Sequence, residues 1–122
     1  MREAPLDIRV KRIYEPAEPT DGYRLLVDRL WPRGVSRQSA SLDAWMKEVG
    51  PSSELRRWFA HDAARWPEFK RRYRAELESR QDLVTEILSL AADGPVTLVY
   101  SARDTDHNQA VALAEYIVAI GN

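Results

Sequence analysis

The chain has no cysteine and no long apolar run, and its charges nearly cancel. The lack of cysteine excludes disulfide bonds, thiolate zinc sites and cysteine nucleophiles, and it suits a reducing compartment. The apolar runs are far too short to cross a bilayer, and the polar residues 1–5 give no sign of a signal peptide. We therefore expect a soluble, cytoplasmic protein. With 18 basic and 19 acidic residues, the net charge of −1 predicts weak overall attraction to nucleic acid or to an acidic membrane.

What the sequence does contain is a series of short strand and helix patterns within 122 residues, a length typical of one domain spanning 1–122. Apolar segments predict three strands, at residues 8–14 near a sheet edge, 23–28 and 96–100. Apolar residues at helical spacing predict five helices: 42–49 capped by Ser41, 53–60, 66–79, 81–92, and one from Asp106, as its cap, to about Ile120. This order of elements predicts an α/β fold, with helices packed on a small sheet of three or four strands.

The connection over residues 15–22 leaves the direction of the first two strands open. It carries two prolines and a Thr-Asp-Gly turn, and it is too short for a full crossover helix. The two strands are therefore either antiparallel or joined by a short irregular crossover.

A dense polar cluster, residues 28–34, follows the second strand. Arg29 and Arg33 carry planar forks suited to a phosphate or carboxylate, and Trp31 offers a flat face for a ring. Because ligands of open α/β sheets bind at the carboxyl ends of strands, this position favours a binding site. The structural alternative is that Asp28 pairs with an arginine and that Trp31 belongs to the core.

A second polar cluster, residues 101–108, follows the last strand and leads into a helix whose first amides are open to an anion. Arg103 is a candidate source of positive charge, Ser101 a hydroxyl contact, and His107 an acid or base near neutral pH. Asp104, Asp106 and His107 also form a weak candidate for a divalent metal site. The structural alternative has Asp106 as a helix cap and Asp104 paired with an arginine.

Two helical segments carry weaker signals. Glu54, Arg57 and His61 share one helix face, which either lines a pocket or forms a surface ladder of ion pairs, and we favour the ladder. The basic run 70–74 is either a nucleic-acid contact or a solvated face balanced by neighbouring glutamates, and we favour the solvated face. Three of the four tryptophans (45, 58 and 66) lie on expected apolar helix faces, which predicts a core role for them.

Four segments together resemble a known family: residues 21–34, 54–62, 69–77 and 97–110. Through them, and above all through Asp-Arg-Leu-Trp-Pro-Arg-Gly at 28–34, the chain resembles the YeaO-like bacterial proteins, the short branch of the domain-of-unknown-function 488 family, over about residues 8–118. The resemblance implies a mainly parallel sheet of Rossmann-like or rhodanese-like topology, and hence a parallel crossover between the first two strands. Longer members tend to carry cysteines after the last strand, where this chain has Ser101, so thiol chemistry of the rhodanese kind is excluded.

The reading we favour is an anion pocket, for a phosphate or nucleotide, formed where the two strand ends converge. As an enzyme, the protein would act on a phosphorylated or nucleic-acid substrate; the alternatives are a non-catalytic nucleotide- or RNA-binding module and a purely structural polar network. The side chains expected to move protons are Asp28, Asp104 and His107. Those expected to bind the ligand are Arg29, Trp31, Arg33, Ser101, Arg103 and Asn108. We assign no metal ligand, the sequence identifies no cofactor, and nucleic acid is expected to bind weakly at most.

Overall fold

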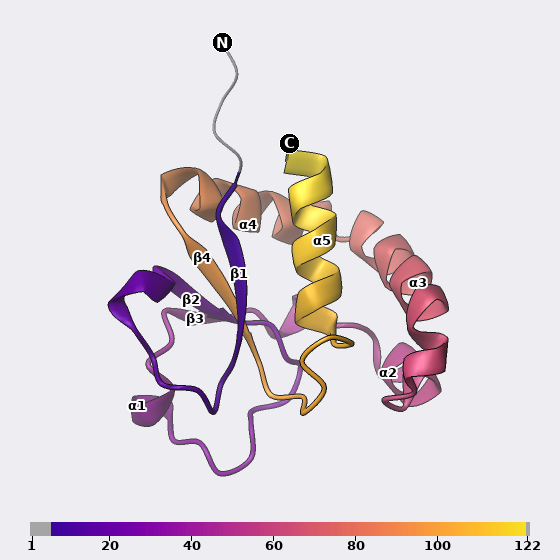
Figure 1. The fold of residues 1–122 in the computed structure, drawn as a ribbon. Coiled ribbons are helices and arrows are strands. Elements are labelled where there is room, and N and C mark those ends of the chain that lie inside the picture. Colours follow the sequence, from indigo (N-terminus) through magenta and orange to yellow (C-terminus); the bar gives the residue numbers. More distant parts are fainter. Residues whose placement is uncertain (1–5, 122) are drawn as a thin grey trace.

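The sheet is parallel throughout and mixes strands from distant parts of the chain (Figure 1). The computed structural model describes residues 6–121, so the prediction made from residues 1–5 lies outside the described range. Within this range the strands are β1 (Ile8–Arg12), β2 (Tyr23–Leu26), β3 (Ala44–Trp45) and β4 (Val96–Tyr100), in the spatial order β1-β4-β2-β3. Both β1 and β2 pair in parallel with β4, with Val10 and Leu25 each opposite Leu98. The last strand of the sequence is therefore central and fully buried.

Five helices accompany this sheet in residues 6–121. They are α1 (Arg37–Ala40), α2 (Ser53–Phe59), α3 (Trp66–Glu78), α4 (Gln81–Asp93) and α5 (Gln109–Gly121). Short 3-10 turns lie at Pro19–Asp21, Lys47–Val49 and Ala63–Arg65. The α/β class, the edge position of β1 and the helices expected over 53–60, 66–79 and 81–92 are confirmed.

The helix predicted over residues 42–49 is wrong. Ser41 does not cap a helix there but ends α1, with its backbone in the left-handed region at φ 50°. The chain then runs alongside β2, where Ala44 pairs with Leu25 and the amide of Met46 donates to the Leu26 carbonyl. The helical spacing of apolar residues was real, but hydrogen bonds to a neighbouring strand decided the backbone conformation.

The crossover between β1 and β2 is parallel, as the family resemblance implied. It passes through the 3-10 turn at Pro19–Asp21 and brings the chain to the opposite side of β4. Gly22 then comes so close to Pro95 that a Cβ at Gly22 would overlap the Pro95 carbonyl oxygen. A short irregular segment, and not an α-helix, therefore connects the two parallel strands.

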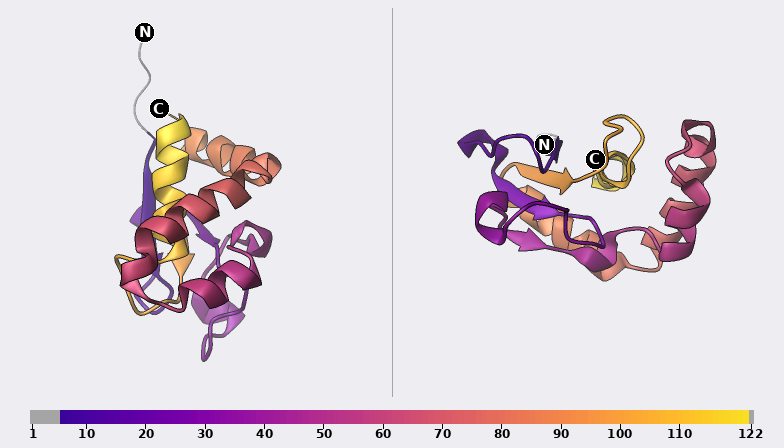
Figure 2. Two further views of the ribbon diagram at one scale, coloured as in Figure 1. Left: turned by 90° about the vertical axis from the view of Figure 1, so that its right-hand side faces the viewer. Right: turned by 90° about the horizontal axis from the view of Figure 1, so that it is seen from below.

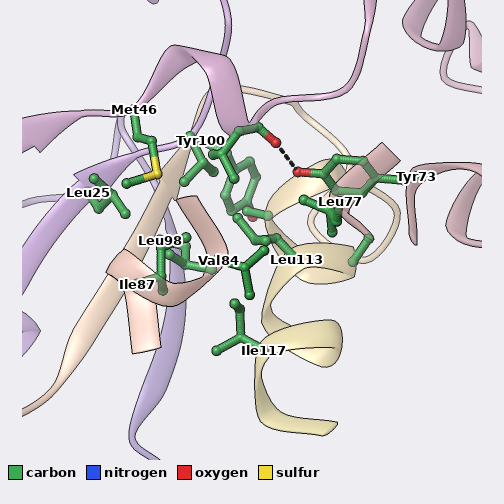
Figure 3. Packing of buried hydrophobic residues seen from close by; sticks show 14 of the residues in the cluster. Leu25, Met46, Tyr73, Leu77, Val84, Ile87, Leu98, Tyr100, Leu113 and Ile117 are labelled. Carbon is green, nitrogen blue, oxygen red and sulfur yellow. Dashed lines mark hydrogen bonds between the residues drawn. The ribbon is translucent and has the colours of Figure 1, made fainter. Parts of the chain in front are cut away.

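The main core lies between one face of the sheet and helices α2 to α5 (Figures 1 and 2). Side chains of a strand alternate between faces, so Leu25 and Leu98 point into this core while Leu26 and Val99 point to the other side. Figure 3 shows Ile87 of α4 beside Leu98, with Leu113 of α5 in the same cluster. The opposite face is covered by a smaller apolar cluster that includes Ala40 of α1.

Candidate functional site

A pocket of about 610 Å³ opens at the carboxyl ends of β2 and β4. Three segments surround it, all at the lower end of the molecule in Figure 1: the loop after β2, the region of α2, and the loop from β4 into α5. The lining residues are 28–33 from the first segment; Pro51, Ser53, Arg56, Arg57, Phe59 and His61 from the second; Ser101, Ala102 and 107–109 from the third; and Phe69 of α3. The two polar clusters of the sequence thus meet because β2 and β4 are neighbours.

Asp28 forms the buried acidic floor of this pocket, with only 7% of its surface exposed. Its carboxylate accepts hydrogen bonds from the Ser101 amide at 3.1 Å, from the Ser101 hydroxyl at 2.6 Å and from the Gln109 side chain. Burial raises the pKa of Asp28 above its ordinary value, while these hydrogen bonds and the charge of Arg56 oppose the rise. Asp28 therefore ties the end of β2 to the start of α5.

Four arginines line the same pocket: Arg29, Arg33, Arg56 and Arg57. Arg29 donates through Nε to the carbonyls of Gly50 and Pro51, at 3.2 and 2.7 Å, which holds it beside α2. Within residues 6–121, none of the four forms an ion pair. The pocket wall thus carries excess positive charge, and Asp28 is the one carboxylate among its described lining residues.

Arg56 has a buried polar atom without a partner. Its Nε is sequestered from solvent and has no hydrogen bond in the structure, while its Nη2 donates weakly to the Ser53 hydroxyl at 3.3 Å. A buried, unsatisfied N–H costs on the order of 1–3 kcal/mol. Because this Nε has almost no accessible surface, it is other atoms of Arg56 that line the pocket.

His61 lies at the pocket and is one of two consecutive residues with an unusual backbone conformation. Ala60 and His61, immediately after α2, both lie in the left-handed region, at φ 48° and 57°. A residue other than glycine in this region costs on the order of 1 kcal/mol, and such backbone strain is common at functional sites. The predicted ladder of Glu54, Arg57 and His61 is wrong: within the described chain these side chains form no ion pair, and Arg57 and His61 line the pocket instead.

The loop from β4 to α5 divides into residues inside and outside the pocket. Ser101, His107 and Asn108 line the pocket. Arg103, which is exposed, and Asp104 do not line it. Asp104 accepts from the amides of Asp106 and His107, at 2.9 and 3.0 Å, and lies 2.9 Å from Nδ1 of the His107 ring. These contacts, the Asp106 amide first, lower the pKa of Asp104. Asp104 therefore holds His107 in place rather than facing a ligand.

The capping of α5 also differs from the prediction. Asn108, not Asp106, caps the helix: its side-chain oxygen accepts from the Val111 amide at 3.0 Å, and its nitrogen donates to the Asp104 carbonyl at 2.9 Å. Within residues 6–121 there is no group of three histidine or acidic side chains able to hold a metal ion, and Asp104, Asp106 and His107 do not form one.

Trp31 lies on the pocket wall, half-buried. Its indole N–H donates to the Val35 carbonyl, Arg37 lies over its ring at 4.6 Å, and its ring meets that of Trp45 edge to face. The other tryptophans are also partly buried and pack at the margin of the core. Trp31 is thus held rigidly by its neighbours.

The polar pocket residues that sequence analysis did not select are Ser53, Arg56, Arg57, His61 and Gln109. Arg57 and His61 had a signal, their shared helix face, but the sequence could not show that this face turns toward the strand ends. Arg56 and Gln109 had none beyond their position beside selected residues.

Fold and site together define a small parallel α/β protein with an arginine-lined pocket at its strand ends. The chain belongs to the domain-of-unknown-function 488 family: residues 7–120 match the group described as "Inactive DUF488-N3 subclade".

Curated relatives match over nearly their whole length. "Uncharacterized protein YeaO" of Escherichia coli K12 is 43% identical over 92% of this chain and 97% of its own. "Uncharacterized protein Rv3073c" of Mycobacterium tuberculosis H37Rv is 39% identical over 90% of this chain and 92% of its own. No solved structure matches the chain significantly. Among the described residues, no helix has the length and apolar character needed to cross a membrane.

Proposed function

We propose that the pocket binds a small phosphate-bearing anion without chemical turnover. The observation that carries this proposal is the set of four arginines, Arg29, Arg33, Arg56 and Arg57, that line one pocket and form no ion pair among residues 6–121. Guanidinium groups bind phosphate through paired hydrogen bonds. The start of α5 at the pocket adds the favourable end of a helix dipole.

Binding is better supported than catalysis. The Asp28 carboxylate accepts hydrogen bonds from Ser101 and Gln109. The Asp104 carboxylate contacts the His107 ring and the amides of its own loop. Neither carboxylate is left poised to move a proton to a ligand. The subclade's description as inactive also favours a site that holds its ligand unchanged.

A small ligand is better supported than a nucleic acid. On the basic run of α3, Glu68 pairs with Arg71 and Arg72, at 2.6 and 2.8 Å, and Lys70 pairs with Glu115 at 3.2 Å. These pairs neutralise part of the positive charge of this run, which weakens its attraction to a phosphate backbone. The pocket itself has a volume in the range typical of small-molecule sites.

Thermal unfolding with and without inorganic phosphate tests the proposal. Phosphate at about 100 times its dissociation constant is expected to stabilise the protein by roughly 2.7 kcal/mol. The Arg56→Gln, Arg57→Gln double variant is expected to lose this stabilisation, because both donors come from the pocket wall.

Arg71→Gln is the matched control, since Arg71 is exposed on α3 and its partner Glu68 retains Arg72. It is expected to keep the response to phosphate. Equal stabilisation of the wild type and the double variant contradicts the proposed site.

A further inference from the structure

The pocket arginines come from two segments of the chain. Arg56 and Arg57 belong to α2, and Arg33 belongs to the loop after β2, where the Tyr14 hydroxyl donates to its carbonyl at 2.9 Å. Arg29 belongs to the same loop as Arg33, and its Nε donates to the carbonyls of Gly50 and Pro51 just before α2. The four guanidinium groups are therefore carried by two separate segments.

The positive charge of the four pocket arginines is greater than is needed to balance one phosphoryl group. Four arginines face one carboxylate, Asp28, whose oxygens already accept three hydrogen bonds. Among residues 6–121 no ion pair neutralises any of the four. Like charges gathered in a partly buried pocket repel one another, and an anion with several charges relieves that repulsion best.

The size of the cavity agrees with more than one anionic group. A single bidentate phosphate engages one or two guanidinium forks, whereas the pocket of about 610 Å³ is lined by four forks from two segments. Arg56 and Arg57 suffice for one group, which leaves Arg33 and the free Nη atoms of Arg29 for a second. Ser53 adds a hydroxyl group beside Arg56, whereas the Ser101 hydroxyl donates to Asp28.

We infer that the ligand of this pocket carries two phosphoryl groups, one bound by the α2 arginines and the other by Arg33 and Arg29. The inference rests on the anion site proposed above and narrows its ligand to a diphosphate. Inorganic pyrophosphate and a nucleoside diphosphate share this chemistry.

Calorimetric titration of the whole chain at one ionic strength tests the inference, with orthophosphate, pyrophosphate and ADP as probes. Pyrophosphate is expected to bind at least about tenfold more tightly than orthophosphate, because the second group gains charge-assisted hydrogen bonds. Arg33→Gln is expected to abolish that preference, because it weakens the binding of the second phosphoryl group more than that of the first. Arg71→Gln, the surface control, is expected to leave both affinities unchanged.

The outcomes separate this inference from the proposed function. Equal affinities for orthophosphate and pyrophosphate, both lost in Arg56→Gln, overturn the two-group ligand and leave the single anion site standing. A preference for pyrophosphate that survives in Arg33→Gln also overturns it. Failure of all three probes to bind overturns both. If the preference holds, tighter binding of ADP than of pyrophosphate identifies a nucleotide as the source of the diphosphate, and weaker binding identifies the inorganic anion.

Discussion

At the scale of single residues, Asp28 joins the pocket to the sheet. It is the buried carboxylate that links β2 to Ser101 and α5, and burial keeps its pKa raised despite three hydrogen bonds. A carboxyl group that binds its proton more tightly in the folded chain favours the folded state most at low pH. Its contribution is complete below the unfolded pKa and is lost as the pH rises through the folded pKa.

Asp28→Asn is expected to remove this pH dependence. From the ordinary value of 3.8 upward, the wild type is expected to lose stability relative to the variant as the pH rises through the raised pKa. Urea unfolding of both proteins between about pH 4 and 7 measures the difference.

Asp104→Asn is the control of opposite sign. Hydrogen bonds lower the pKa of Asp104, so here the wild type is expected to lose its advantage as the pH falls through that pKa. A stability difference between the wild type and Asp28→Asn that does not change with pH contradicts the role assigned to Asp28.

At the scale of elements, the beginning of α5 decides which groups face the pocket. Asn108 is 2% exposed and makes two side-chain hydrogen bonds to the backbone, whereas Asp106 is exposed and contributes only its amide. The helix therefore starts two residues later than its sequence suggests. The intervening loop folds around Asp104 and directs His107 and Gln109 toward the cavity.

Asn108→Ala is expected to lower the free energy of unfolding by about 1–2 kcal/mol, the usual cost of losing a helix cap. Asp106→Ala is expected to change it by less than about 0.5 kcal/mol, as for an ordinary surface position. Denaturant unfolding of the two variants compares them directly. Equal losses would show that Asp106, as first expected, shares the capping of the helix.

At the scale of the whole molecule, the parallel sheet depends on a tight passage between β1 and β2. Gly22 has φ 66° and lies against Pro95, at the point where the Tyr23 amide donates to the Pro95 carbonyl at 3.0 Å. This contact brings the beginning of β2 beside the beginning of β4. The two strand ends that form the pocket are thereby set next to each other.

Gly22→Ala is expected to destabilise the fold by about 2–5 kcal/mol, because left-handed strain adds to overlap with Pro95. Gly34→Ala isolates the strain: its φ is 77°, but an added Cβ would meet nothing within 4 Å. That variant is expected to lose only about 1–2 kcal/mol. Thermal unfolding of both tests the comparison, and similar losses contradict a special role for the passage at Pro95.

The sequence by itself determined the elements whose apolar pattern is long and regular, and the chemistry available at the strand ends. The helices α2, α3 and α4 and the buried strand β4 follow from local spacing, and Asp28, Ser101 and His107 follow from their position after apolar runs. Such patterns are local, so they can be recognised without knowing which segments pack against each other.

Only the tertiary structure decided what depends on neighbours. Pairing with β2 turned residues 44–45 into a strand, the strand order put β4 in the centre, and packing turned α2 so that Arg56 and Arg57 face the strand ends. The same packing left Arg103 outside the pocket. The spacing of residues in the sequence specifies which face of a helix or strand each one occupies. Contacts between distant segments specify what packs against that face.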